Sequence, residues 1–256
     1  MFEILLGLVV GLGAIVFVMI KGDMVGLLFN IEALVLVFGG TIGAIIITYP
    51  MKLLANGLSA LRIVIFSRWK YNPEDVIKTI VHLSEKVKRD GIFAVNDDIQ
   101  KLDKFLQDGL RMMLDGLDSN LIRENLQKEI LFTRKRHEQI SDIFRSMGTY
   151  APIFGLLGTL MGVVQVLKNI TDVKSLGTSM ALAVTATFYG IVGTNFVFLP
   201  LAGKLEARSD EELLIKEVMI EGIISIHQGD IPIITARKLE AFISSKNRRK
   251  KGYESQ

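Results

Sequence analysis

The chain reads SMGTYAPIFGLLGTLMGVVQVL from residue 146 to residue 167, without one Asp, Glu, Lys, Arg or His. Three further uncharged stretches cover residues 4–20, 33–51 and 175–203. A helix needs about 20 mostly apolar residues to cross the hydrocarbon core of a bilayer. The pattern therefore predicts an all-α polytopic membrane protein with four transmembrane helices and a helical domain outside the membrane.

Basic residues are distributed unevenly around these spans. Of the 30 Lys and Arg residues, only Lys21, Lys168 and Lys174 lie in the two short connections. Because basic residues concentrate on the cytoplasmic side of membrane proteins, both long segments and both termini are predicted to be cytoplasmic. The predicted divisions are transmembrane helices 1 and 2 in residues 1–51, a cytoplasmic helical domain in 52–145, transmembrane helices 3 and 4 in 146–203, and cytoplasmic C-terminal helices with a basic tail in 204–256.

Composition narrows the class of protein. Hydrophobic residues make up 50% of the chain and charged residues 22%, and the charges gather in blocks, as in a membrane protein with large water-exposed parts. Cysteine is absent, which excludes disulfides, iron–sulfur clusters and thiolate zinc sites. The three histidines show no metal-binding spacing, and no nucleophile, base or metal cluster lies close to the membrane. We therefore expect no enzyme, no metal site and no cofactor.

Helical patterns recur outside the spans. A helix over residues 73–90 is predicted, because Asn72 can cap it, Pro73 suits its first position and Gly91 can end it. Further helices are predicted over residues 97–114, from about residue 119 into the third span, over 205–226 and over 235–243. Their apolar stripes indicate a small helical bundle. The basic tail at residues 246–251 is interpreted as facing solvent or lipid headgroups, with no nucleic acid as partner.

The last two spans carry hydroxyls and prolines in place of charges. Proline inside a helix frees a carbonyl and bends the axis, so Pro152 and Pro200 are candidate gate or hinge positions, with ordinary kinking and packing as the alternative. Thr159 and Thr187 can shape an ion route, but they cannot bind an ion firmly without a titratable group. If an ion gradient is used, a partner chain is predicted to supply the carboxylate.

The motif Ala-Pro-x-x-Gly-x-x-Gly-Thr-x-x-Gly occupies residues 151–162. With it, the chain resembles the MotA/TolQ/ExbB proton-channel family over nearly its whole length. The four predicted spans favour the flagellar stator branch, because the TolQ and ExbB branches have three. Thr187, Tyr189 and Pro200 in the fourth span add to the resemblance.

The resemblance implies a flagellar motor stator subunit in the bacterial inner membrane. Five copies would surround the single spans of two MotB chains, whose membrane Asp takes the ion, and the ring would turn the rotor through FliG. Thr187 would face that Asp, with Pro152 beside it and Pro200 at the cytoplasmic end of the span. The full set of implied ion-pathway residues is Thr187, Pro152, Thr159, Ala186, Tyr189 and Pro200.

The resemblance also implies a rotor-binding surface that pairs a basic and an acidic residue with charges on FliG. Lys88 falls at the basic position, with Arg89 beside it, whereas Asn96 stands where an acid is usual. Asp97 and Asp98 are the candidate substitutes. A solvated helix end is the alternative interpretation of this cluster.

Ion identity depends on one position of the fourth span. Sodium-driven relatives tend to have two adjacent threonines there and one in the third span; here Thr159 and Thr187 match, but Ala186 replaces the second hydroxyl. A partly dehydrated sodium ion needs several oxygen ligands, whereas a proton needs an acceptor and a water path. Protons are therefore predicted, with sodium drive or a TolQ/ExbB-like envelope transducer as alternatives. A small-solute transporter would need a polar membrane site of its own, which this chain lacks.

Overall fold

The computed structural model describes residues 2–26, 28–66, 72–168, 171 and 173–242. The regular elements within these residues are all helices, as predicted. Three helical segments among them are long and apolar enough to cross a membrane, and they lie in Ile31–Thr48, Ser119–Lys168 and Leu176–His227.

The first predicted span falls in α1 (Phe2–Lys21), whose described apolar part, Leu6–Lys21, is shorter than the other three. The number of four spans therefore stays a prediction. The basic tail predicted at residues 246–251 lies outside the described residues.

The chain forms two compact units. Unit 1 comprises residues 1–67 and 137–207, and unit 2 comprises residues 68–136 and 208–256. The long helices α8 (Ser119–Lys168) and α10 (Leu199–His227) contribute residues to both. As predicted, one helix begins at Ser119 and continues into the third apolar stretch.

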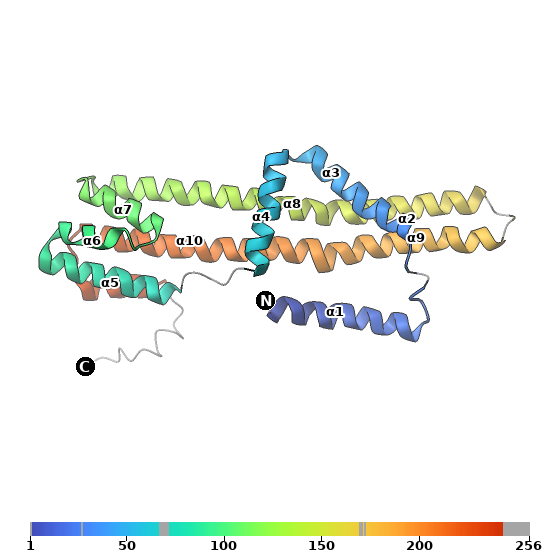
Figure 1. The fold of residues 1–256 in the computed structure, drawn as a ribbon, viewed down its shortest axis with the longest axis horizontal. Coiled ribbons are helices and arrows are strands. Elements are labelled where there is room, and N and C mark those ends of the chain that lie inside the picture. Colours follow the sequence, from blue (N-terminus) through green and yellow to red (C-terminus); the bar gives the residue numbers. More distant parts are fainter. Residues whose placement is uncertain (1, 27, 67–71, 169–170, 172, 243–256) are drawn as a thin grey trace. The chain divides into compact units, whose positions relative to one another are not determined.

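In unit 1, the apolar part of α8 runs beside α9 (Val173–Gly193) (Figure 1). The second apolar stretch consists of α2 (Ile31–Leu34), η1 (Val35–Gly39) and α3 (Gly40–Thr48), and α4 (Met51–Phe66) follows it. The buried contact of these helices contains Ala33, Val37, Ala151, Leu182, Ala186 and Phe198.

Two tyrosines fix the ends of the second apolar stretch. At one end, the Tyr189 hydroxyl donates to the carbonyl of Leu28 (2.8 Å) and accepts from the N–H of Asn30 (3.3 Å). At the other end, the Tyr49 hydroxyl lies 2.8 Å from Oγ of Ser146 on α8. Tyrosine suits such positions because its ring packs in apolar surroundings while its hydroxyl finds a polar partner. These bonds hold the stretch against α8 and α9.

The helix that contains α9 and α10 is widened by a π-helical segment, η3 (Thr194–Phe198). Pro200 follows one residue later, as the second residue of α10; it has no N–H for the carbonyl of Phe196, and its ring crowds that carbonyl. π-helical turns are rare and occur mostly as single turns inside α-helices. Pro200 therefore alters the helix without ending it.

Unit 2 begins with α5 (Pro73–Asp90), which the sequence predicts correctly. The side chain of Asn72 caps it by accepting from the N–H of Glu74 (3.2 Å), and Pro73 occupies the first turn. Gly91 ends it with φ of +87°, a conformation that suits glycine. The charged end of α5 is thereby fixed next to the turn that follows.

The single helix predicted over residues 97–114 is wrong. The structure has η2 (Ile92–Val95), α6 (Asn96–Ile99) and α7 (Lys104–Leu114). Asp103 causes the break, because its backbone is extended and its carboxylate caps α7 by accepting from the N–H of Phe105 (2.9 Å). Likewise α11 (Pro232–Glu240) begins at Pro232, before the predicted start at residue 235, because proline suits the first turn.

A polar network holds α11 against the end of α10. Oδ2 of Asp230 accepts from Nζ of Lys238 and from Oγ of Ser225, both at 2.6 Å. Oγ of Ser225 also lies 2.9 Å from the hydroxyl of Thr235. The hydrogen bond from Lys238, followed by that from Ser225, lowers the pKa of Asp230. The turn between the two helices is therefore held by a charged carboxylate.

Candidate functional site

The contact between α8 and α9 is built from small residues and backbone. A Cβ added at Gly155 would lie 2.9 Å from the carbonyl oxygen of Ala186, and one added at Gly162 would lie 2.7 Å from that of Ser179. A Cβ at Gly190 would likewise meet the carbonyl oxygen of Ala151 at 2.7 Å. Since these neighbours are main-chain atoms, a side chain at any of the three glycines would separate the helices.

Both helices present the same spacing to this contact. The small residues are Ala151, Gly155, Gly158 and Gly162 on α8, and Ser179, Ala183, Ala186 and Gly190 on α9. Steps of four, three and four residues keep them on one face of each helix. The glycine motif of α8 is visible in sequence, but its match on α9 was missed because alanine and serine alternate there with glycine.

Two hydroxyls meet within this contact. Oγ1 of Thr159 lies 2.5 Å from Oγ1 of Thr187, and both atoms are part-buried. Oγ1 of Thr159 is 3.2 Å from the carbonyl oxygens of Gly155 and Ala183, and Oγ1 of Thr187 is 3.5 Å and 3.4 Å from the same two oxygens. We call these four oxygen atoms the threonine cluster.

The threonine cluster can pass protons between hydroxyls, but it carries no charge of its own. Each hydroxyl both donates and accepts, so the pair can reorient its hydrogen bonds among the four oxygens. In apolar surroundings a cation without a countercharge is expensive. The cluster therefore suits a route that works with a carboxylate from another chain.

The structure brings only some of the predicted pathway residues together. Ala186 is fully buried, and a Cβ added at Gly158 would lie 2.3 Å from its Cβ, so it forms part of the packed wall beside Thr187. Pro152 lies against Gly190 in the same contact, 3.1 Å from the Cβ that Gly190 lacks. Tyr189 turns its hydroxyl to Leu28 and away from the threonine cluster.

Pro200, the last predicted pathway residue, lies at the start of α10 directly after η3, outside the threonine cluster.

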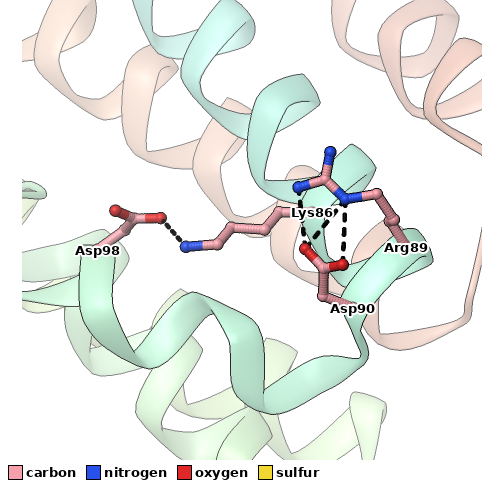
Figure 2. A network of polar contacts seen from close by, with 4 residues as sticks. All are labelled: Lys86, Arg89, Asp90 and Asp98. Carbon is pink, nitrogen blue, oxygen red and sulfur yellow. Dashed lines mark hydrogen bonds and ion pairs between the residues drawn. The ribbon is translucent and has the colours of Figure 1, made fainter.

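The predicted rotor-binding residues lie at the end of α5 and in α6 of unit 2. Figure 2 shows two of them, Arg89 and Asp98, with their partners Asp90 and Lys86. Arg89 holds Asp90 through Nε and Nη2, with its Nη2 2.9 Å from Oδ2. Nζ of Lys86 lies 2.7 Å from Oδ2 of Asp98. The hydrogen bond from Lys86 lowers the pKa of Asp98, and the one from Arg89 lowers the pKa of Asp90.

Lys88 differs from its charged neighbours. It is exposed and makes no ion pair with the described side chains, while Arg89 and Asp98 are each paired within the chain. The side chain of Asp97 lies outside the described part of the structure. Phe93, in η2 after α5, is 74% exposed. Its exposure was not predicted, because nothing in the local sequence pattern separates an exposed from a buried aromatic residue.

Comparisons with known proteins agree on one family. Residues 97–218 match the family described as MotA/TolQ/ExbB proton channel family. The chain is 31% identical to chemotaxis protein PomA of Vibrio alginolyticus over 95% of this chain and 96% of that protein. It is 39% identical to motility protein A of Borreliella burgdorferi, over 72% and 71%. The flagellar MotAB stator complex from Bacillus subtilis is similar in structure, with a TM-score of 0.83 and 31% identity over 93% of this chain and 97% of that chain.

Proposed function

The chain belongs to the MotA/TolQ/ExbB proton channel family, and we propose that it is a flagellar motor stator subunit. In this proposal it assembles with a MotB-like partner into an ion channel and converts ion flow into torque. The similarity spans nearly the full length, so it includes the helices outside the family region. The family consists of membrane ion-channel proteins, not enzymes.

The threonine cluster is the observation that carries the mechanism. It places two hydroxyls in contact between two helices whose apolar stretches contain no charged residue. A channel built on such a pair needs a carboxylate from outside the chain, and we assign that role to a membrane Asp of the single-span partner. Protonation and release of this Asp beside Thr187 would drive each step of the ring.

We assign the proton as the transported ion. Ala186 offers no side-chain oxygen next to Thr187, and its packing against Gly158 leaves no Cβ-sized space there. The hydroxyls of Thr159 and Thr187 are already engaged with each other and with two carbonyls. A sodium ion would have to displace these bonds to collect enough oxygen ligands, whereas a proton would use them as they are.

The assembly in this proposal follows the family resemblance. Five copies surround a dimer of the partner in the bacterial inner membrane, with four spans in each copy and both termini in the cytoplasm. The exposed apolar side chains of α8, such as Leu156 and Leu160, are available to lipid or to neighbouring chains. They suit a subunit that is surrounded by apolar partners on most sides.

For the rotor contact we assign Lys88 as the leading charge. Arg89 and Asp98 are engaged within the chain, so a partner such as FliG would have to compete with Asp90 and Lys86 for them. Lys88 has no ion pair with a described side chain that a partner would have to break. Exposed charges of this kind mainly steer and align partners, which fits a contact that forms and breaks at every step.

Motility tests the function directly. In a strain that lacks the gene, we expect flagella that assemble but do not turn. In the complemented strain, rotation should stop when the proton gradient is collapsed and persist when the sodium gradient is collapsed. Rotation that follows sodium would keep the stator function and overturn the ion assignment. Cells that swim without the gene but have a weakened envelope would instead favour a TolQ/ExbB-like transducer.

A further inference from the structure

Pro152 leaves one carbonyl of α8 without its helical donor. In an uninterrupted helix the N–H of residue 152 would donate to the carbonyl of Gly148, four residues earlier, and proline has no N–H. The structure supplies a substitute from the neighbouring helix: Oγ1 of Thr194 donates to this carbonyl at 3.0 Å, in a buried position. An unsatisfied backbone group in apolar surroundings is costly, so this bond offsets the vacancy that proline creates.

Close approach of the two helices makes the bond possible. A Cβ added at Gly148 would lie 2.9 Å from Cδ2 of Leu199. Thr194 itself is only 7% exposed, so water has little access to the carbonyl. The site therefore depends on one hydroxyl as the replacement donor.

Thr194 also begins η3, the π-helical segment that precedes Pro200. A single hydrogen bond thus joins the irregular part of α8 to the irregular part of the α9–α10 helix. Both elements lie in unit 1 at these positions.

The bond lies in register with the threonine cluster. Thr194 is seven residues from Thr187 along its helix, and Gly148 is seven residues from Gly155 along α8. On both helices, about two turns therefore separate the Thr194–Gly148 bond from the threonine cluster. A slip of one residue changes the axial position by about 1.5 Å, which is enough to break hydrogen bonds of 2.5–3.5 Å in the cluster.

We propose that Thr194 is a positioning residue of the ion pathway: its bond to the carbonyl freed by Pro152 sets the register of α8 against α9 that holds Thr159 and Thr187 together. The inference rests on the proposed stator function. It adds a residue that the sequence pattern did not single out, and it gives Pro152 a role through the group that it leaves unbonded.

The test compares Thr194→Val, which keeps the shape and removes the donor, with Thr194→Ser, which keeps the donor. Ser141→Ala is the matched control, because Oγ of Ser141 donates the same kind of buried hydrogen bond to the carbonyl of Ala202 (3.1 Å). That carbonyl also has its ordinary helical donor, the N–H of Glu206, so it does not depend on the hydroxyl. The readouts are the rotation speed per stator unit at low load, taken from speed steps as units join a motor, and the number of units.

We expect Thr194→Val to lower the speed per unit clearly below that of wild type, because without the donor α8 and α9 are no longer held in the register that keeps Thr159 and Thr187 together. Thr194→Ser and Ser141→Ala should stay close to wild type. Equal speeds per unit for Thr194→Val and Ser141→Ala would overturn the proposal, as would a Thr194→Ser loss equal to that of Thr194→Val. A fall in the number of units at unchanged speed per unit would also overturn it, because that is a purely structural effect. Swimming without the gene would instead remove the stator function itself.

A second measurement covers the case in which Thr194→Val does not assemble enough units. Pro152→Ala restores an N–H for the carbonyl of Gly148, so in that background the hydroxyl is no longer needed. The thermal unfolding midpoint of the purified complex should fall with Thr194→Val in the native sequence and should not fall when Pro152→Ala is also present. An equal fall in both backgrounds would refute the link between the two residues.

Discussion

The two units of this protein hold their helices together in different ways. In unit 1, the α8–α9 contact is lined by Gly, Ala and Ser, and backbone atoms meet backbone atoms. In unit 2, large aliphatic side chains fill the core; among the described residues, the largest fully buried side chains all belong to unit 2 except Val37. The unit 2 members are Ile80, Leu83, Val95, Leu110, Met113, Ile122, Leu126, Leu213, Val218, Ile223 and Leu239.

The difference follows from the solvent. Apolar side chains in water gain free energy when they are buried, so unit 2 buries Leu and Ile. Lipid tails are as apolar as Leu, so burial from lipid gives little, and helices associate through close packing and hydrogen bonds. The threonine cluster and the Thr194–Gly148 bond belong to the second kind of contact.

The largest effect on stability is expected from a truncation in unit 2. Leu110 is 0% exposed, and Leu110→Ala should lower the free energy of unfolding by about 2–5 kcal/mol, because it removes apolar contacts and leaves a cavity. Ile47→Ala in unit 1 is the control, since that side chain is 88% exposed. Calorimetry of the purified complex should show a large shift for the first variant only. Equal shifts would contradict the assignment of Leu110 to the packed core of unit 2.

One identical substitution in both units sharpens the comparison. Gly162→Ala places a Cβ 2.7 Å from a backbone carbonyl of α9, which cannot move alone, so we expect a cost of about 1–3 kcal/mol and loss of rotation. In unit 2, a Cβ added by Gly109→Ala would lie 2.4 Å from Cδ1 of Ile223, the end of a side chain that can change its rotamer. Motor rotation should therefore persist in this variant. Gly203→Ala, with nothing within 4 Å, controls for glycine replacement in unit 1. Motility and unfolding midpoints measure all three.

A smaller effect is expected at Asp230, whose charge holds α11. Asp230→Asn should lower stability at pH 7 by about 1 kcal/mol, because the hydrogen bonds from Lys238 and Ser225 lose their charged acceptor. The pKa of Asp230 is lowered in the folded state, so its contribution is present above the unfolded pKa of about 3.9 and is lost as pH falls through the folded value. The difference between wild type and variant should therefore shrink below about pH 4. A constant difference down to pH 2 would contradict this account.

The smallest effect on stability, within about 0.5 kcal/mol, is expected at the exposed Lys88. Lys88→Glu should nevertheless reduce stall torque, because it reverses a charge of the predicted rotor surface that is exposed and makes no ion pair with the described side chains. Arg89→Ala is the comparison, since it frees Asp90 while leaving Lys88 in place. Bead assays at high load measure both. A larger loss of torque with Arg89→Ala would move the main contact to that residue.

Several elements could be predicted because their signals are local. The cap at Asn72, the end at Gly91 and the start of α8 at Ser119 follow from residues within one turn of each boundary. The break at Asp103 was missed because the apolar spacing on both sides of it fits one continuous helix, and the cap hydrogen bond decided otherwise. Thr159 and Thr187 were recognised as separate candidates, but sequence spacing says nothing of the distance between them.

The sequence by itself determined the helical class, the apolar stretches, the segregation of charge and the family. It could do so because the length of an uncharged stretch and the spacing of glycines are properties of a single helix. The tertiary structure decided which hydroxyls meet, that Tyr189 fastens the loop before α2, and that Arg89 and Asp98 are paired within the chain. It also decided that the hydroxyl of Thr194 donates a hydrogen bond to the carbonyl of Gly148, which Pro152 leaves without its helical donor. These facts depend on the register between helices, which is set by contacts between residues far apart in the chain.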